Sequence, residues 1–394
     1  MNAMGQSRRR FLRSMAGLGG FVLCGAAKPA PPDYAEPLSS ALAFLAARQS
    51  HDGAWRSDHY GAFRGGDALT PLVLWAMQDA PRLAASGGAF SRGLRWLEGL
   101  TDAQAKSAEP GPETPYPLFT ASYAAQVFVR AGDRRRAAIW VAMIERLRVS
   151  GALGWPPNDP ACGAWGDSPF PPRLPPDVHP PPDMLAPNLS ATLLGVRALA
   201  AVGRGGNGRD AQPFIESCQN FAPDSASAFD DGGFVFAPDD SVRNKAGLAG
   251  RDSGGRVRFN SYGSATCDGF LALHFCGLPA DHPRMAAAAA WLQQHGAGLG
   301  QSGRWMESRS VGRESLVFYY GQALADALAV LSREPCYRAW AVTQQHLLAS
   351  GLIERQRDDG AWEGKAPNSC EDDPLLATAF GLRALTRIAA QNRD

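Results

Sequence analysis

Two short stretches near the two ends of the chain decide the fold. Residues 44–55 read Phe-Leu-Ala-Ala-Arg-Gln-Ser-His-Asp-Gly-Ala-Trp, and residues 351–362 read Gly-Leu-Ile-Glu-Arg-Gln-Arg-Asp-Asp-Gly-Ala-Trp. In both, the pattern predicts a helix that ends at Gln, an Asp-Gly turn, and then Trp. Glycine supplies the backbone freedom that leaving a helix requires, and tryptophan offers a large apolar face that covers the turn. The two stretches are therefore copies of one repeat.

Each copy of the repeat continues into a second helix. Helices are predicted over residues 67–78 and 374–390, so that each repeat is an antiparallel helix pair. Four more degenerate pairs are predicted between them, at residues 91–97 with 120–129, 136–140 with 188–199, 214–219 with 261–273, and 284–292 with 315–324. A Pro-rich stretch over 169–187 is predicted to be a long surface loop.

Six helix pairs can close as two concentric rings, with the first helix of each pair outside and the second inside. Inner helices then have no solvent face and are apolar all round. Residues 72–77, 189–199 and 263–275 fit this requirement, and no alternating strand pattern of useful length is present. The sequence therefore predicts an all-α protein, an α/α toroid (an α6/α6 barrel), with a single domain over residues 38–394.

The composition restricts the classes of partner. The chain has 394 residues, of which 45% are hydrophobic, so it can bury a substantial core. Its 39 basic and 38 acidic residues leave a net charge of +1, which provides no field that would attract nucleic acid. We find no phosphate-cradling Gly loop, haem attachment motif or Cys cluster for iron and sulfur, and we predict no cofactor.

The first residues are typical of an export signal. Residues 7–13, Ser-Arg-Arg-Arg-Phe-Leu-Arg, precede an apolar run over 15–23 and small residues at 25–27. We predict a twin-arginine signal peptide over 1–30 and a Pro-rich leader over 31–37. The apolar run is too short for a permanent membrane anchor. The protein is therefore expected to use the twin-arginine export machinery and to be periplasmic or secreted; lipid anchoring at Cys24 is disfavoured because Leu23 before it is large.

The Gln-x-x-Asp-Gly-Ala-Trp turns and the Thr-Ala-rich second helices resemble the repeats of squalene-hopene cyclases, related terpenoid cyclases and the β subunits of protein prenyltransferases. The resemblance covers residues 38–390 and is strongest at both ends. It implies a central cavity, with the starts of the inner helices at the mouth where these families place their chemistry. Hopanoid cyclases resemble two fused helical barrels, whereas this chain has the length of one. The resemblance therefore bears on fold more than on activity.

The acid motif of squalene cyclases is missing from its expected place. These enzymes resemble one another in an Asp-x-Asp-Asp-Thr-Ala run whose acid protonates an alkene. Residues 374–377, Pro-Leu-Leu-Ala, stand opposite those acids. Glu371, Asp372 and Asp373 lie just upstream, where capping of a helix is the favoured interpretation. Asp372 and Asp373 as displaced catalytic acids are the alternative, and Asp67 before the second helix of the first repeat has the same two interpretations.

The zinc site of the prenyltransferases is also incomplete. Their zinc is held by an Asp, a Cys and a His on neighbouring inner helices. Asp268 matches the Asp, but Phe270 stands for the Cys and Tyr320 for the His. His274, which shares a helix with Cys267, is interpreted as a core histidine. We therefore predict no metal.

What remains for a site is a set of aromatic residues near the inner-helix starts. We expect Tyr262, Tyr319, Tyr320, Phe119 and Asp268 to contact a ligand, because a buried tyrosine needs a polar partner or an opening. The leading hypothesis is an exported protein that binds a hydrophobic or isoprenoid small molecule in the central cavity, with catalysis left open.

The sequence leaves two alternative functions open. A non-catalytic protein-interaction scaffold would be favoured by a cavity plugged with side chains. A carbohydrate-acting α/α barrel would require two of Asp67, Asp268 and Asp372 to face each other across an open cleft as acid and base.

Overall fold

The structure is a computed structural model that describes residues 33–80, 83–106, 114, 116–174, 185–223, 227–296 and 298–391. The predicted signal peptide, including Cys24, lies outside these residues. The chain from Asp33 onward forms one compact unit. Its first helix, α2 (Ala35–Ala47), begins inside the segment that was predicted to be a leader.

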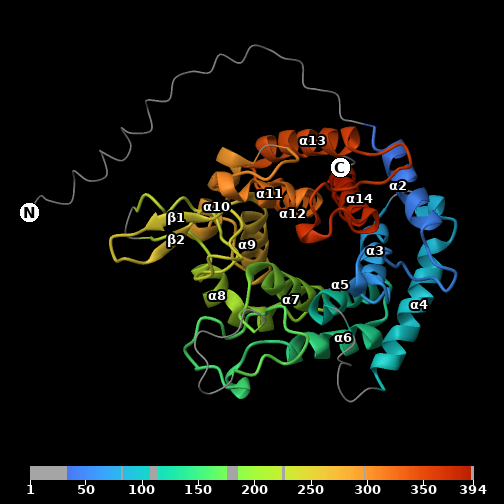
Figure 1. The fold of residues 1–394 in the computed structure, drawn as a ribbon, viewed down its shortest axis with the longest axis horizontal. Helices are drawn as coiled ribbons and strands as arrows, with labels where there is room; N and C mark the ends of the chain where they lie inside the picture. The colour runs from blue at the N-terminus through green and yellow to red at the C-terminus, as the bar shows by residue number, and fades with distance from the viewer. Residues whose placement is uncertain are drawn as a thin grey trace, which may run out of the picture. The chain divides into compact units, whose positions relative to one another are not determined.

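The helices of the described residues form two concentric rings (Figure 1). The outer ring contains α2, α4 (Ala89–Gln104), α6 (Arg134–Arg146), α8 (Gln212–Ser217), α10 (Pro283–His295) and α13 (Arg338–Glu354). The inner ring contains α3 (Leu69–Met77), α5 (Pro117–Arg130), α7 (Leu189–Ala201), α9 (Gly263–Phe275), α12 (Val317–Leu331) and α14 (Pro374–Gln391). Each inner helix contacts the next, and α14 contacts α3, which closes the ring. The predicted α/α toroid is confirmed.

Smaller elements occupy the connections. A short helix, α11 (Ser310–Glu314), precedes α12. The strands β1 (Leu248–Arg251) and β2 (Val257–Phe259) pair antiparallel in a hairpin that the sequence did not predict. Short 3₁₀ helices lie at Gly61–Phe63, Leu83–Ser86, Gly151–Leu153, Gly205–Ala211, Glu307–Arg309 and Pro367–Ser369. None of the helices in the described part of the chain is long and apolar enough to cross a membrane.

Burial separates the two rings as the sequence pattern requires. Every residue of α3 is buried, and so is every residue of α9 from Gly263 to Leu273. The outer helix α4, by contrast, buries only Ala89, Gly93, Leu97 and Thr101 along one face. A helix that is apolar all round is enclosed by neighbours, whereas an amphipathic one covers a surface.

The glutamine of the repeat ties each turn to the next outer helix. Gln49 Nε2 donates to the carbonyl oxygens of Gly53 in its own turn and Ala89 at the start of α4, both at 2.8 Å. Gln356 Nε2 donates in the same way to Gly360 and to Pro37 of α2, both at 2.9 Å. The last repeat thus bonds to the first, and the outer ring closes as the inner one does.

The aromatic residue of the turn is held by a threonine of the inner helix. The backbone N–H groups of Trp55 and Trp362 donate to Thr70 Oγ1 and Thr378 Oγ1, both at 3.0 Å. Two central repeats make the same bond, between Trp165 and Thr192 at 3.2 Å and between Phe234 and Thr266 at 3.1 Å. These inner-helix hydroxyls therefore serve the fold.

Candidate functional site

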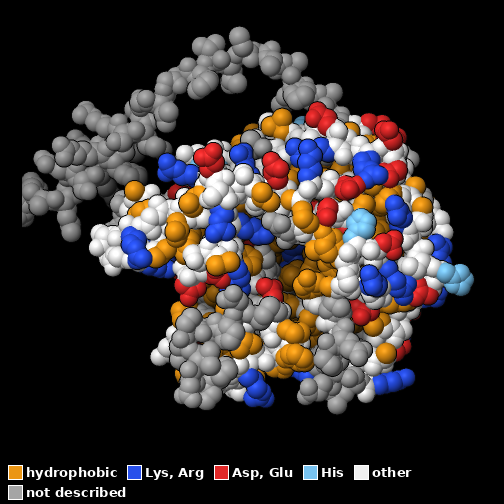
Figure 2. Space-filling view, viewed as in Figure 1, with side chains coloured by type: hydrophobic (Ala, Val, Ile, Leu, Met, Phe, Trp, Pro, Cys, Tyr) orange, Lys and Arg blue, Asp and Glu red, His pale blue; other side chains and the backbone are white. Residues whose placement is uncertain are grey.

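A cavity of about 260 Å³ lies where several inner helices begin. Its wall comes from the starts of α5, α7, α9 and α12 and from the loops between them. Most of the wall is apolar or aromatic, with Phe119, Tyr123, Ala191, Leu194, Tyr262 and Tyr319 among the lining residues. In the space-filling view the middle of the toroid is hollowed, and hydrophobic side chains gather around the hollow (Figure 2).

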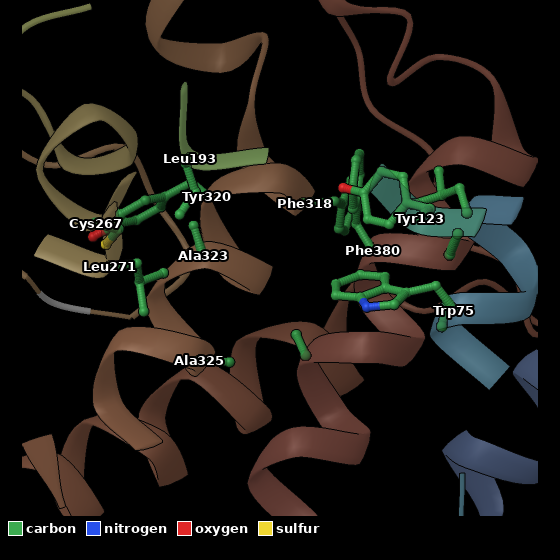
Figure 3. Packing of buried hydrophobic residues seen from close by; sticks show 14 of the residues in the cluster. Trp75, Tyr123, Leu193, Cys267, Leu271, Phe318, Tyr320, Ala323, Ala325 and Phe380 are labelled. Carbon is green, nitrogen blue, oxygen red and sulfur yellow. The ribbon is translucent and has the colours of Figure 1, made fainter. Parts of the chain in front are cut away.

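Aromatic rings continue from the cavity into the ring of inner helices. Phe119 meets Tyr123 edge-on with ring centroids 4.7 Å apart, and Tyr123 lies 4.8 Å from Trp75. Figure 3 shows Trp75, Tyr123 and Phe380 gathered close to one another. Tyr319 contacts Phe380 edge-on at 5.5 Å. Such a wall suits an apolar ligand, and the faces of its rings can stabilise a positive charge.

Asp268 of α9 is fully buried beneath this wall. It accepts hydrogen bonds from Ser190 Oγ at 2.6 Å and from the Tyr319 hydroxyl at 2.8 Å. Burial raises the pKa of Asp268 to about 6, although the bonds from Ser190 and Tyr319 and the charge of Arg197 act in the opposite direction. Burial also holds the pKa of Tyr319 well above its usual range, so the phenol keeps its proton. Ser190 and Tyr319 line the cavity, and Asp268 therefore positions two hydroxyls at its floor.

The acidic cluster before α14 lies at helix starts and outside the cavity lining. The Glu371 carboxylate accepts from the backbone N–H groups of Phe318 at 3.1 Å and Tyr319 at 2.7 Å, in the first turn of α12. Burial raises the pKa of Glu371 to about 7. Asp373 Oδ1 accepts from the N–H of Leu375 at 2.8 Å, and its buried Oδ2 has no hydrogen-bond partner among the described residues.

Other predicted site residues lie apart from the cavity. Asp372 accepts from the Tyr60 hydroxyl. Asp67, in the loop before α3, is half-buried, and this burial raises its pKa against the effect of the Arg56 charge. The Tyr320 hydroxyl is hydrogen-bonded to Ser302 Oγ at 3.1 Å. Figure 3 shows the Tyr320 ring beside Cys267, away from the Trp75 cluster.

The structure thus brings together only some of the residues that the sequence predicted for the site. Phe119, Tyr262 and Tyr319 line one cavity, Asp268 is bonded to its floor, and Tyr320 faces elsewhere. Asp67, Asp268 and Asp372 each have a different partner, and no hydrogen bond within the described residues joins any two of them. No group of three or more His, Cys, Asp or Glu side chains in the described ranges could hold a metal ion.

Sequence reasoning missed two charged residues of the lining, Asp167 and Lys245. Both lie on loops, Asp167 before α7 and Lys245 before β1. The Asp167 carboxylate accepts from Asn188 Nδ2 at 2.9 Å. No motif marks either residue, because their approach to the cavity depends on the path of two long connections.

Charged side chains of the inner helices lie next to the aromatic cluster. The Arg383 guanidinium lies 4.4 Å from the centre of the Trp75 ring and forms an ion pair with Asp79 at 2.7 Å. Arg197 of α7 pairs with Asp326 of α12 at 3.2 Å, and both residues are buried. The central space is therefore open toward the inner-helix starts and filled with side chains in their C-terminal halves.

Among known proteins, the chain is similar to a set of solved structures. No family model matches it, and no curated protein matches it by sequence. A single-residue variant of the type II terpene cyclase MstE from Scytonema, in complex with the substrate geranylgeranyl dihydroxybenzoate, is similar with a TM-score of 0.55 and 15% identity, covering 91% of this chain and 97% of that one. The GH76A α-1,6-mannanase from Salegentibacter sp. HEL1_6 is similar with a TM-score of 0.56 and 10% identity, covering 91% and 99%.

A cellobiose 2-epimerase from Spirochaeta thermophila is similar with a TM-score of 0.54 and 15% identity, covering 98% of this chain and 100% of that one. At such identities the likeness is one of fold, and one fold hosts many functions. The chain is an α/α toroid, an architecture that it shares with a terpene cyclase and with enzymes named for carbohydrate substrates.

Proposed function

We propose that the protein binds a small hydrophobic molecule of the isoprenoid type in the cavity at the inner-helix starts. The observation that carries this proposal is the cavity of about 260 Å³ with a mainly apolar and aromatic wall. Ligand sites are typically concave and apolar, contain a few placed polar groups, and measure about 300–1,000 Å³. This cavity is slightly smaller, so a short ligand fits it best. A terpene cyclase of the same fold holds a prenyl substrate, which supports the choice of ligand class.

The floor of the cavity supports proton transfer to or from such a ligand. Ser190 and Tyr319 line the cavity, and their hydroxyls both donate to Asp268. A carboxyl with a pKa of about 6 changes its protonation near neutral pH, which is what general acid or base catalysis requires. Because Asp268 is itself absent from the lining, a proton would pass through one of the two hydroxyls.

The other two functions receive less support. A scaffold would need no cavity, whereas here a cavity is present at the mouth. Carbohydrate cleavage would need two facing carboxylates. Asp167 is the one carboxylate in the described lining, and it is already bonded to Asn188.

The first test is native mass spectrometry of the mature protein from its own compartment, followed by organic extraction. We expect a stoichiometric isoprenoid or lipid to leave the protein. Titration calorimetry with geraniol then tests the cavity. Ala191→Leu adds a larger side chain to the wall and should abolish binding, whereas Ala201→Leu, at an exposed position on the same helix, should leave binding unchanged. A protein that stays bare in both experiments would refute ligand binding.

For localisation, we propose export through the twin-arginine pathway, on the strength of residues 7–13 and the apolar run that follows them. Cell fractionation with the two arginines Arg8 and Arg9 changed to lysine tests it. We expect the wild-type chain outside the cytoplasm and the variant inside. Equal distribution of the two would contradict the proposal.

A further inference from the structure

The cavity wall contains one cation, Lys245, that forms no ion pair with another described residue. Lys245 lines the cavity, and no hydrogen bond or ion pair joins its ammonium group to another described residue. Asp167, the anion of the same lining, is held by Asn188. Lys245 is half-buried, so its charge is only partly removed from water. An anionic group in the cavity would therefore be a direct counter-charge for it.

The loop that carries Lys245 is rigidly held. Its neighbours Asn244 and Ala246 are both completely buried. The Asn244 side chain makes four hydrogen bonds of 2.7 to 3.2 Å with the backbone of Phe236, Ala237 and Asp240. The backbone of Lys245 is thus placed before any ligand arrives, which reduces the entropy lost on binding.

The electrostatics of this end of the toroid oppose a cation. Helix N-termini carry partial positive charge, and α5, α7, α9 and α12 all begin at the cavity. Burial lowers the pKa of Lys245, and Glu371 is the charge that acts in the opposite direction. Glu371 attracts the charge of Lys245 but forms no ion pair with it, and its two oxygens accept backbone N–H groups of α12. Lys245 has no evident role in stabilising the fold, and we therefore consider a role in contacting the ligand.

We propose that the ligand carries one carboxylate at the end of its apolar chain and that Lys245 binds this carboxylate. The inference rests on the proposed ligand-binding function and names the class of ligand. A phosphate would need several donors. The nearby N–H groups of Ala191 and Ser264 already donate to Asn188 Oδ1 and Gln301 Oε1, and the floor hydroxyls donate to Asp268. One free ammonium group matches one carboxylate.

The experiment compares geranic acid, geraniol and geranyl monophosphate, which share one apolar chain, by titration calorimetry. We expect the wild-type protein to bind geranic acid about tenfold more tightly than geraniol, as one charge-assisted hydrogen bond provides. Lys245→Met keeps the apolar stem and should remove this preference while geraniol binding stays within about twofold. Lys245→Arg should retain the preference. Lys365→Met, at an exposed lysine outside the cavity lining, is the matched control.

Three results would overturn the inference while leaving the proposed function intact. The wild-type protein could bind the acid and the alcohol equally, Lys245→Met could weaken both alike, or geranyl monophosphate could bind more tightly than the acid. If none of the three compounds binds and the extracted protein is bare, the proposed ligand-binding function fails, and this inference fails with it.

Discussion

At the scale of single residues, Asp268 decides the chemistry of the cavity floor. Its carboxylate is enclosed by α7, α9 and α12, and the hydroxyls of Ser190 and Tyr319 replace the water that would otherwise solvate it. Two hydrogen bonds do not fully replace that water, and burial is the main cause of the raised pKa. Burial of the ionised Asp268 carboxylate therefore lowers the free energy of unfolding, which a residue that only supports the fold would not do.

This cost predicts a pH dependence of stability. The pKa of Asp268 is raised from 3.8 to about 6, so the folded protein binds the proton more tightly than the unfolded chain does. The free energy of unfolding contributed by this group is therefore highest below pH 4 and falls by roughly 3 kcal/mol as the pH rises to about 6. Chemical denaturation between pH 4 and 7 should show this loss in the wild-type protein relative to Asp268→Asn.

Glu371 has a raised pKa of the same sign and remains in both proteins, so its effect cancels in the comparison. Parallel pH profiles for the two proteins would contradict the assignment to Asp268. Ligand conversion that requires the protonated carboxyl would likewise decrease as the pH rises through about 6, and calorimetry of binding separates this effect from a loss of affinity.

At the scale of elements, the aromatic residue of the turn packs against a glycine of the inner helix in the central and last repeats. A Cβ atom at Gly381 of α14 would lie 2.7 Å from the indole of Trp362, and one at Gly195 of α7 would lie 2.6 Å from Trp165. Each glycine stands three residues after the threonine that bonds the turn. The Thr-x-x-Gly spacing is therefore a sequence signal that would have located the central repeats more firmly.

We predict that Gly381→Ala destabilises the protein by about 1–3 kcal/mol, since the added methyl group must displace the Trp362 ring or α14. Gly99→Ala, on the exposed face of α4 with open space around it, is the matched control. It should be neutral or stabilising by up to about 1 kcal/mol, because alanine favours the helix. Urea denaturation measures both, and equal effects would show that contact with the ring is not the cause.

At the scale of the whole molecule, buried charges hold the inner ring together where its centre is filled. Asp326 of α12 pairs with Arg197 of α7 and with Arg387 of α14, at 3.2 and 3.5 Å. Arg383 of α14 pairs with Asp79 after α3. These pairs cross between helices that are distant in the sequence, and they add to the closure that α14 makes with α3.

We predict that Asp326→Asn lowers the free energy of unfolding by about 3–5 kcal/mol, because Arg197 is left buried without a counter-charge. The control is Asp102→Asn, which breaks a partly exposed pair with Arg136 and leaves Arg136 paired with Asp133, so it should change stability little. Both are measured by urea denaturation at neutral pH. An Asp326 variant as stable as the control would mean that water reaches Arg197 and solvates it.

The sequence by itself determined the architecture, because the requirements of the repeat are local. Gln bonds the Gly of its own turn and Trp bonds the helix before it, so the repeat shows in a short stretch of sequence. An inner helix shows its place by having no polar face. The same feature hid the site. A helix that is apolar all round gives no periodicity that distinguishes the side facing the cavity from the side facing the outer ring. Only the tertiary structure therefore decided that Tyr319 lines the cavity and Tyr320 does not, and only the path of the loops brought Lys245 and Asp167 to its wall.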